Sequence, residues 1–303
     1  MPATDRSPVW LKGKRGKGRD ESLLRKAVLM VHSSWSSHAK RWVTGLGLAV
    51  PLVAMLLYGP LWLWTLAVSA AAAVGLWEYE TLAQCPAMTR LELAFSLAVG
   101  AVFPAVAWLF GPAGVLAWAV GSVFALWGKQ LARPPLTRDT FQRGLITLGG
   151  WFYVALPLAF VMLLGALESG RAWVFFVLFV IVSGDVGAYY TGKSFGRRKL
   201  YEAVSPKKTV EGAVGGLASS AVVGTIFGVL FLGDTGASVA ALGAVSIVTE
   251  LVGQAGDLME SLLKRMAGCK DSSALLPGHG GLLDRLDSLL FAFPTVWVYA
   301  QGL

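Results

Sequence analysis

Apolar segments of membrane-spanning length recur along almost the whole chain and constrain its fold more than any other feature. A helix needs roughly 17 to 25 mainly apolar residues to cross a bilayer. Nine segments come close to or meet this requirement: 43–58, 60–77, 91–110, 112–127, 144–164, 172–191, 212–232, 237–256 and 286–303. Because a segment in lipid must satisfy its own backbone hydrogen bonds, we predict an all-α, polytopic integral membrane protein with about nine transmembrane helices. Tight hairpins are expected at Gly59-Pro60 and Gly111-Pro112.

Basic residues lie almost entirely on one side of these predicted spans. If the N-terminus is cytoplasmic, 25 of the 26 Lys and Arg residues fall in the N-terminal tail and in alternate loops, and Arg171 alone lies outside. Cytoplasmic loops of membrane proteins carry such an excess, so we predict a cytoplasmic N-terminus. The net charge of +8 then reflects topology and attraction to anionic lipids. We therefore expect no nucleic-acid partner.

We divide the chain into three regions. Residues 1–42 are a basic cytoplasmic tail in which 21–42 could form an amphipathic helix at the membrane surface. Residues 43–171 form an N-terminal transmembrane region, and residues 172–303 a C-terminal transmembrane catalytic region. The first apolar segment starts late and runs on as a span, so no secretory signal peptide is expected. The twelve tryptophans are expected mostly at the membrane interfaces and facing lipid.

A polar island over residues 261–287 lies between the last two apolar segments. It holds eight ionisable residues: Lys264, Arg265, Lys270, Asp271, His279, Asp284, Arg285 and Asp287. Charges of both signs beside a bilayer core indicate a functional site. Carboxylates can hold a divalent cation, and basic groups with glycines suit phosphate oxygens. We therefore predict phosphate chemistry here.

A second polar island follows the sixth apolar segment. Asp185 lies inside that segment, and six basic residues follow within the loop 192–211. Lysine and glycine suit a triphosphate, because lysine is a mobile point charge and glycine lets backbone amides approach anionic oxygens. Two further acidic residues lie in apolar surroundings. Glu250 is deep enough to need a partner, whereas Glu78 is equally consistent with a satisfied interfacial residue.

Both islands resemble the signature of the phosphatidate cytidylyltransferases, also called CDP-diacylglycerol synthases. The first matches S-x-apolar-K-R, four residues, K-D, and then H-G-G-apolar-x-D-R-apolar-D, from Ser261 to Asp287. The second matches D-x-x-A-Y-x-x-G from Asp185 and S-P-K-K-T-x-E-G from Ser205. The resemblance implies that CTP and phosphatidic acid are converted into CDP-diacylglycerol and pyrophosphate for phospholipid biosynthesis. It covers the C-terminal 120 or so residues.

The resemblance also implies roles for individual residues. The CTP site would be formed by Ser205, Lys207, Lys208, Thr209, Glu211 and Asp185. The lipid phosphate would be bound by Lys264, Arg265, His279 and Arg285. The residues that carry catalysis would be Asp257, Asp284, Lys208 and Asp287. For His279, a general base and a phosphate contact both remain open.

A magnesium ion is the predicted cofactor. Asp257 and Asp284 end and begin two helices at the same membrane surface, so their carboxylates can converge on a hard cation. Asp271 and Asp287 lie close to this pair in the sequence, and Asp287 could be a ligand or a neighbour of one. The resemblance also allows a second, monovalent cation.

The implied setting is the cytoplasmic (inner) membrane of a bacterium, with the active site facing the cytoplasm and CTP, phosphatidic acid and the bilayer as partners. A homodimer is left open. Two other interpretations remain. A transporter or flippase for anionic lipids would use Asp185 and Glu250 as coupling groups and would contain inverted repeats. A related CTP-using lipid or polyprenol kinase would share the same kinds of catalytic residues.

Overall fold

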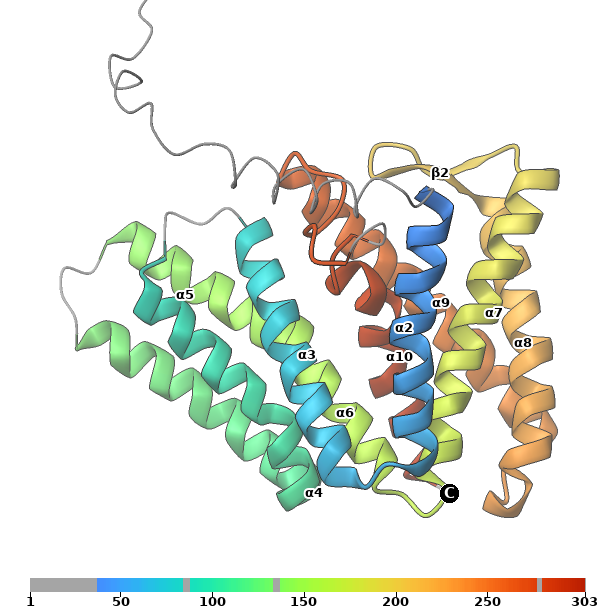
Figure 1. Cartoon of the computed structure of the whole chain (residues 1–303), viewed down its shortest axis with the longest axis horizontal. Coiled ribbons are helices and arrows are strands. Elements are labelled where there is room, and N and C mark those ends of the chain that lie inside the picture. The colour runs from blue at the N-terminus through green and yellow to red at the C-terminus, as the bar shows by residue number, and fades with distance from the viewer. Residues whose placement is uncertain (1–36, 84–87, 133–136, 277–279, 303) are drawn as a thin grey trace, which may run out of the picture.

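The structure, a computed structural model, describes residues 37–83, 88–132, 137–276 and 280–302 (Figure 1). The predicted tail therefore lies outside the described residues up to position 36. The described residues are nearly all α-helical, as expected. Their elements are α2 (Ser37–Tyr58), α3 (Leu61–Leu82), α4 (Arg90–Leu131), α5 (Arg138–Gly150), the π-helical turn η1 (Trp151–Ala155), α6 (Leu156–Gly165), α7 (Gly170–Phe195), β1 (Lys199–Tyr201), β2 (Ser205–Thr209), α8 (Val210–Phe231), the 3₁₀ turn η2 (Gly233–Thr235), α9 (Val239–Met266) and α10 (Leu283–Ala300).

Six helical stretches among the described residues are long and apolar enough to cross a membrane. They are Leu61–Leu82, Arg90–Leu131, Arg138–Gly165, Gly170–Phe195, Val210–Phe231 and Val239–Met266. The third joins α5, η1 and α6 into one continuous stretch. The protein is therefore an integral membrane protein. The first and last predicted spans coincide with the apolar parts of α2 and α10, which fall outside this group of six.

Helix α4 is a hairpin of two antiparallel arms, as the Gly111-Pro112 dipeptide predicts. Gly111 has φ 64° and ψ −160°, a conformation that glycine adopts without a Cβ penalty. Proline at the next position has its φ preset for the first turn of a new helix. The indole of Trp118 in the second arm donates a hydrogen bond to the carbonyl of Val99 in the first, at 3.2 Å. Two predicted spans thus occur within one element.

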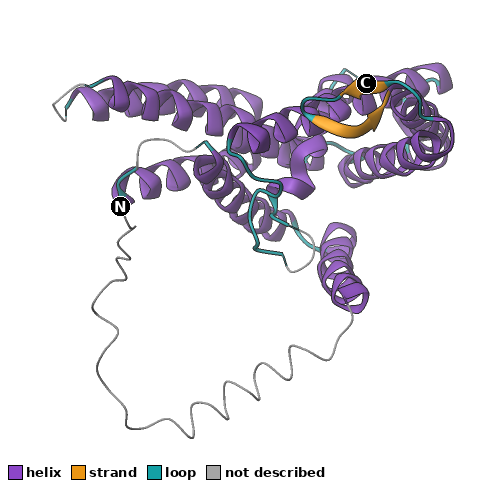
Figure 2. Ribbon diagram, turned by 90° about the horizontal axis from the view of Figure 1, so that it is seen from above, coloured by secondary structure: helices purple, strands orange, loops and turns teal. Residues whose placement is uncertain are grey.

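The helices form two groups joined by α6 and α10. Helices α3, α4, α5 and α6 pack together on one side, and α7, α8, α9 and α10 on the other (Figure 1). The β1–β2 hairpin and the connection from α9 to α10 lie at one end of the helices, and the C-terminus lies at the opposite end. Viewed from that first end, the hairpin lies over the α7–α8 group (Figure 2). Both predicted polar islands therefore reach the same surface.

Small residues bring the helices of the second group close together. At Gly187 of α7, an added Cβ would lie 2.5 Å from the Cβ of Ser219 in α8, so any larger residue would push the helices apart. Such close approach through small residues is common between membrane helices. Elsewhere in the helices of both groups, large side chains fill the core. Trp64, Trp151 and Trp173 are fully buried there, so the expectation of interfacial tryptophans is wrong for these three.

Candidate functional site

The second polar island folds into a β-hairpin that leads directly into α8. Its strands pair antiparallel, with Lys199 opposite Thr209 and Tyr201 opposite Ser205. Thr209 then caps the helix, because its hydroxyl accepts a hydrogen bond from the backbone N–H of Gly212 at 3.1 Å. The S-P-K-K-T segment is thus held in extended form immediately before a helix N-terminus, where anions are stabilised.

Glu211 fastens this hairpin to the first turn of α8. Its carboxylate accepts hydrogen bonds from the backbone N–H groups of Arg197 at 3.0 Å and Arg198 at 3.2 Å. These contacts hold the segment that precedes β1. The predicted contact between Glu211 and CTP stays a prediction, and the observed contacts give this residue a role in shaping the loop.

A polar cavity of about 360 Å³ lies between this hairpin and helices α7, α8 and α9. Its lining includes four of the six residues predicted to bind CTP: Asp185, Lys207, Lys208 and Thr209. Ser205 and Glu211 are not among the lining residues. Two polar residues of α9 that sequence reasoning did not assign to the nucleotide, Glu250 and Gln254, complete the wall.

An ion pair joins the second polar island to α9, just before the first island begins. The ammonium group of Lys208, on β2, contacts the carboxylate of Asp257, on α9, and about a quarter of each side chain is exposed. A lysine of the predicted nucleotide loop therefore lies against a predicted metal ligand. The neighbouring Gly256 allows α9 and α10 to approach, since a Cβ there would lie 2.5 Å from the carbonyl oxygen of Asp287.

Three carboxylates gather next to this ion pair. One oxygen each from Asp257, Glu260 and Asp287 lies within 4.8 Å of the others. Glu260 is fully buried, and its Oε1 atom has no hydrogen-bond partner among the described residues. An orphaned buried carboxylate oxygen within an all-oxygen donor set fits a hard divalent cation. The sequence named Asp257 and Asp287 as candidates but missed Glu260.

Asp284 lies in a different environment from these three. Its Oδ1 accepts a hydrogen bond from Lys264 Nζ at 2.6 Å, and its Oδ2 accepts from the backbone N–H groups of Ser272 at 2.9 Å and Gly281 at 2.8 Å. Burial raises the pKa of this carboxyl, but these hydrogen bonds outweigh burial and lower the pKa to about 2. Metal binding by Asp284 stays a prediction. Its observed contacts organise the loop before α10.

Glu78 of α3 is the principal site-shaping residue that the sequence left undecided. Its side chain is fully buried and accepts hydrogen bonds from the backbone N–H groups of Leu282 at 3.0 Å and Leu283 at 2.6 Å, and from the hydroxyl of Ser273 at 2.6 Å. It thus caps the start of α10. The signal was a carboxylate at the end of an apolar segment, which needs partners, but nothing in the sequence said which ones.

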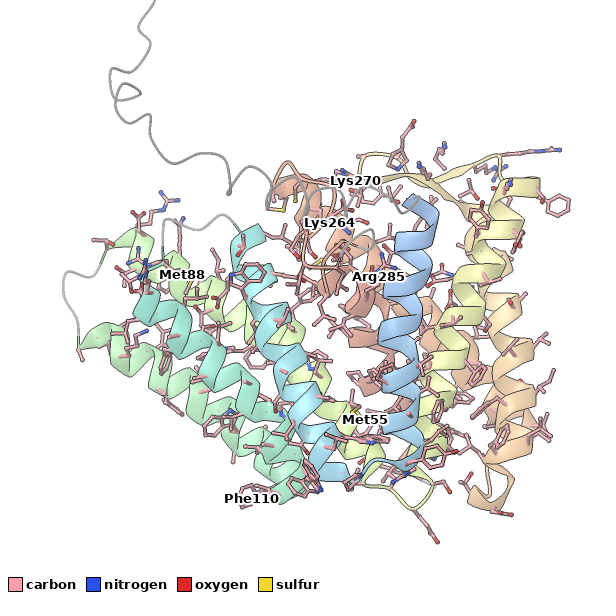
Figure 3. The ribbon with its side chains drawn as sticks, in the orientation of Figure 1. Met55, Met88, Phe110, Lys264, Lys270 and Arg285 are labelled. Carbon is pink, nitrogen blue, oxygen red and sulfur yellow. The ribbon has the colours of Figure 1, made fainter. Side chains whose placement is uncertain are left out.

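The residues predicted to bind the lipid phosphate do not share one environment. The ammonium of Lys264 contacts Glu260 as well as Asp284. Arg285 is exposed on α10, at the same end of the bundle as Lys264 (Figure 3). His279 lies outside the described residues.

Arg265 ties the end of α9 to the hairpin. Its Nε donates to the carbonyl of Val204 at 3.2 Å and its Nη1 to the carbonyl of Cys269 at 3.3 Å. Val204 lies in the turn between β1 and β2, so this hydrogen bond attaches the hairpin to the end of α9. Binding of a lipid phosphate by Arg265 stays a prediction.

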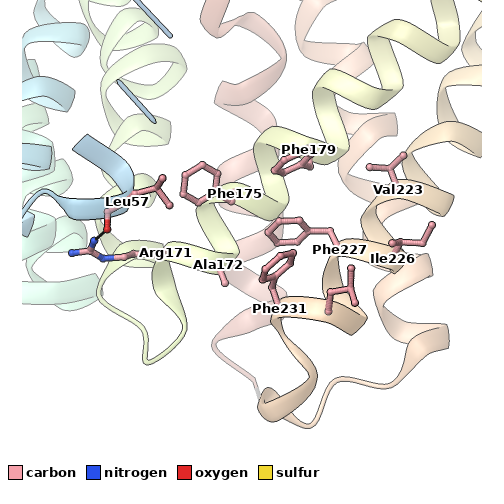
Figure 4. Close-up of a pocket in the computed structure, with 10 residues that line it drawn as sticks. Leu57, Arg171, Ala172, Phe175, Phe179, Val223, Ile226, Phe227 and Phe231 are labelled. Atoms are coloured by element: carbon pink, nitrogen blue, oxygen red, sulfur yellow. Dashed lines mark hydrogen bonds between the residues drawn. The ribbon is translucent and has the colours of Figure 1, made fainter. Parts of the chain in front are cut away.

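A larger, apolar cavity of about 570 Å³ lies far from these groups, between α7 and α8 (Figure 4). Phenylalanines dominate its wall, among them Phe175, Phe179 and Phe227. The guanidinium of Arg171 at its edge donates to backbone carbonyls at the end of α2, including that of Gly59 at 2.9 Å. The cavity offers contacts to hydrocarbon and no arrangement for phosphate chemistry.

The fold and site together define an integral membrane protein with a lysine-lined and carboxylate-lined cavity at one end of its helices, which suits phosphate-rich ligands. The family model described as the cytidylyltransferase family matches residues 39–303. The chain belongs to this family. The match includes both transmembrane regions, and so it extends well beyond the C-terminal motifs.

Individual relatives are named as phosphatidate cytidylyltransferases. A phosphatidate cytidylyltransferase of Bacillus subtilis (strain 168) is 40% identical over 166 residues, which cover 54% of this chain and 61% of that protein. One of Staphylococcus aureus (strain COL) is 41% identical over 129 residues, 43% of this chain and 49% of that protein. One of Mycobacterium bovis (strain ATCC BAA-935 / AF2122/97) is 32% identical over 84% of this chain and 86% of that protein. The chain thus spans only about half to three-fifths of the length of the first two.

Proposed function

We propose that this protein is a CTP:phosphatidate cytidylyltransferase that forms CDP-diacylglycerol and pyrophosphate. The observation that carries the proposal is the ion pair between Lys208 and Asp257, which joins the nucleotide-type loop to the carboxylate cluster in one site. Membership in the cytidylyltransferase family and the names of the relatives support the choice of CTP and phosphatidic acid.

The reaction requires two polyanions to be brought together. An oxygen of the lipid phosphate forms a bond to the α-phosphorus of CTP, the bond from that phosphorus to the bridging oxygen breaks, and pyrophosphate leaves. Lys207 and Lys208, which line the cavity, would neutralise the triphosphate and the leaving group. Arg285, exposed beside the site, would receive the lipid phosphate. Catalysis then rests mainly on positioning and charge neutralisation.

We propose that Asp257, Asp287 and Glu260 hold the magnesium ion. When bound, magnesium would neutralise phosphate oxygens and hold them in place. Lys264 contacts both Glu260 and Asp284, so its positive charge sits at the edge of the cluster and would reduce repulsion among the carboxylates. A second, monovalent cation would share this acidic region.

We infer nine membrane crossings with a cytoplasmic N-terminus. Helices α2, α3, α7, α8, α9 and α10, the two arms of α4 and the α5–α6 stretch coincide with the nine apolar segments of the sequence. The excess of Lys and Arg in alternate loops supports an orientation with the polar cavity facing the cytoplasm. CTP is available on the cytoplasmic side. The protein would lie in the inner membrane of a bacterium.

Labelled nucleotide distinguishes this function from its alternatives. The purified full-length protein would be incubated with phosphatidic acid, Mg²⁺ and CTP carrying label either in cytosine or in the γ-phosphate. A cytidylyltransferase transfers the cytosine label into lipid and leaves the γ label in pyrophosphate. A lipid kinase transfers only the γ label, and a transporter transfers neither. Absence of cytosine label in lipid would refute the proposal.

A further inference from the structure

Gln254 of α9 lines the polar cavity, and two hydrogen bonds orient its side-chain amide. Its Nε2 atom donates to the backbone carbonyl of Ala213 at 3.1 Å and to Oε1 of Glu250 at 2.8 Å. A carbonyl oxygen only accepts, and so does a carboxylate. The opposite orientation of the amide would place its oxygen against two acceptors. The Oε1 atom of Gln254 is therefore directed away from both, and it has no hydrogen-bond partner among the described residues.

The positions of both side chains are fixed by close packing. Glu250 is only 2% exposed. A Cβ added at Gly216 of α8 would lie 2.9 Å from Nε2 of Gln254 and 3.1 Å from Oε1 of Glu250, so the pair fills a slot that glycine leaves open. Nε2 of Gln254 is thus held in one orientation, which Glu250 and Ala213 determine. Such preorganisation is what discrimination between similar ligands requires.

Gln254 lies one helical turn before the carboxylate cluster on α9. It precedes Asp257 by three residues on α9, a rise of about 4.5 Å along the helix axis. The same cavity contains Lys207 and Lys208. A nucleotide whose phosphates contact these lysines and the carboxylate cluster can therefore extend its base along α9 toward Gln254 and Glu250.

We propose that Gln254 recognises the 4-amino group of cytosine and that Glu250 is its positioning residue. This inference rests on the proposed function and specifies which base the cavity accepts. Cytosine carries an amino donor at the position where uracil carries a carbonyl acceptor. The oriented Oε1 atom accepts from the cytosine amino group, whereas uracil would place an oxygen against it. Two acceptor oxygens that face each other without a donor between them disfavour UTP.

Nucleotide analogues test this inference on the unmodified protein. CTP with two methyl groups on N4 has no N4–H donor, whereas 5-methyl-CTP keeps both donors. We expect kcat/KM to fall about 10- to 100-fold for the dimethylated nucleotide, which corresponds to about 1–3 kcal/mol. The 5-methyl compound controls for added bulk and should stay within a few-fold of CTP. Equal use of both analogues would overturn the inference.

Variants test the two residues separately. Gln254→Ala should lower kcat/KM for CTP at least tenfold and leave that for UTP unchanged. Glu250→Gln keeps the shape but adds an amide, which no longer dictates the orientation of Gln254, so selectivity for CTP over UTP should shrink. Gln142→Ala, at an exposed glutamine of α5, is the matched control. A purely structural role would lower both rates equally and would overturn the inference.

The outcomes separate this inference from the proposed function. If the unmodified protein incorporates no cytidine into lipid, the proposed function and the inference both fail. If it incorporates cytidine but Gln254→Ala retains the full preference for CTP over UTP, the inference alone fails. A result in which Asp185→Asn, at another residue that lines the cavity, changes the preference while Gln254→Ala does not would also overturn it.

Discussion

Glu78 and Leu283 are 205 positions apart in the sequence, yet the carboxylate of Glu78 accepts the backbone N–H of Leu283 at 2.6 Å. This contact joins α3, in the N-terminal group of helices, to the first turn of α10 beside Asp284. The carboxylate also compensates the partial positive charge of that helix end. The N-terminal transmembrane region therefore does more than anchor the protein, because it holds the loop that carries part of the site.

Replacing Glu78 with Gln should weaken this attachment. The amide would turn an NH₂ group toward backbone N–H donors, leaving buried groups unpaired, so we expect the free energy of unfolding to fall by about 3 kcal/mol. The melting temperature in detergent and the kcat with CTP should both decrease. Glu168→Gln, at an exposed glutamate, provides the matched control. A variant with wild-type melting temperature and turnover would show that the contact is dispensable.

Substitutions in and beside the carboxylate cluster should distinguish metal ligands from residues that hold the loop. Asp257→Asn and Asp287→Asn should abolish turnover, since losing a charged ligand costs several kcal/mol of transition-state stabilisation. Any residual activity should need more Mg²⁺. In Asp284→Asn, the loop contacts of Ser272 and Gly281 weaken, so stability should fall as well.

Activity titrated against Mg²⁺ and thermal melting together distinguish these cases. Asp234→Asn, in the exposed η2 turn, serves as the control. More than about a tenth of the activity in both Asp257→Asn and Asp287→Asn would refute the metal assignment. An altered Mg²⁺ requirement in Asp284→Asn without any loss of stability would restore Asp284 as a ligand, as the sequence predicts.

The two lysines of β2 should differ in what their removal does. Lys207→Ala removes an exposed cavity charge and should raise the KM for CTP. Lys208→Ala also leaves Asp257 without its ion-pair partner, so we expect a loss of kcat in addition. Lys→Arg changes should rescue only partly, because a planar fork does not replace a compact charge. Unchanged kinetics in both alanine variants would exclude this loop as the nucleotide site.

Local patterns predicted the elements well, and the contacts between distant segments much less. The turn at Gly111 and the capped helix after Thr209 follow from residues within a few positions of each other. For Lys208 and Asp257, the sequence predicted only that both residues lie at the same membrane surface, and not that they form an ion pair. The partners of Glu78 were not predictable, since an apolar span reveals its period but not which helix it faces. The burial of Trp64 was not predicted for the same reason.

The orientation in the membrane makes a final prediction that is independent of family membership. With 25 of 26 basic residues on one side, the hairpin and the α9–α10 connection should face the cytoplasm, and the turn at Asp234 should face outward. Single cysteines would be introduced after replacing Cys85 and Cys269, and intact cells treated with a membrane-impermeant thiol reagent. A cysteine at Asp234 should label, whereas cysteines at Ser205 or Ser273 should label only after the cells are opened. Labelling of position 273 from outside would contradict the span count and remove the shared cytoplasmic site, because CTP could not reach it.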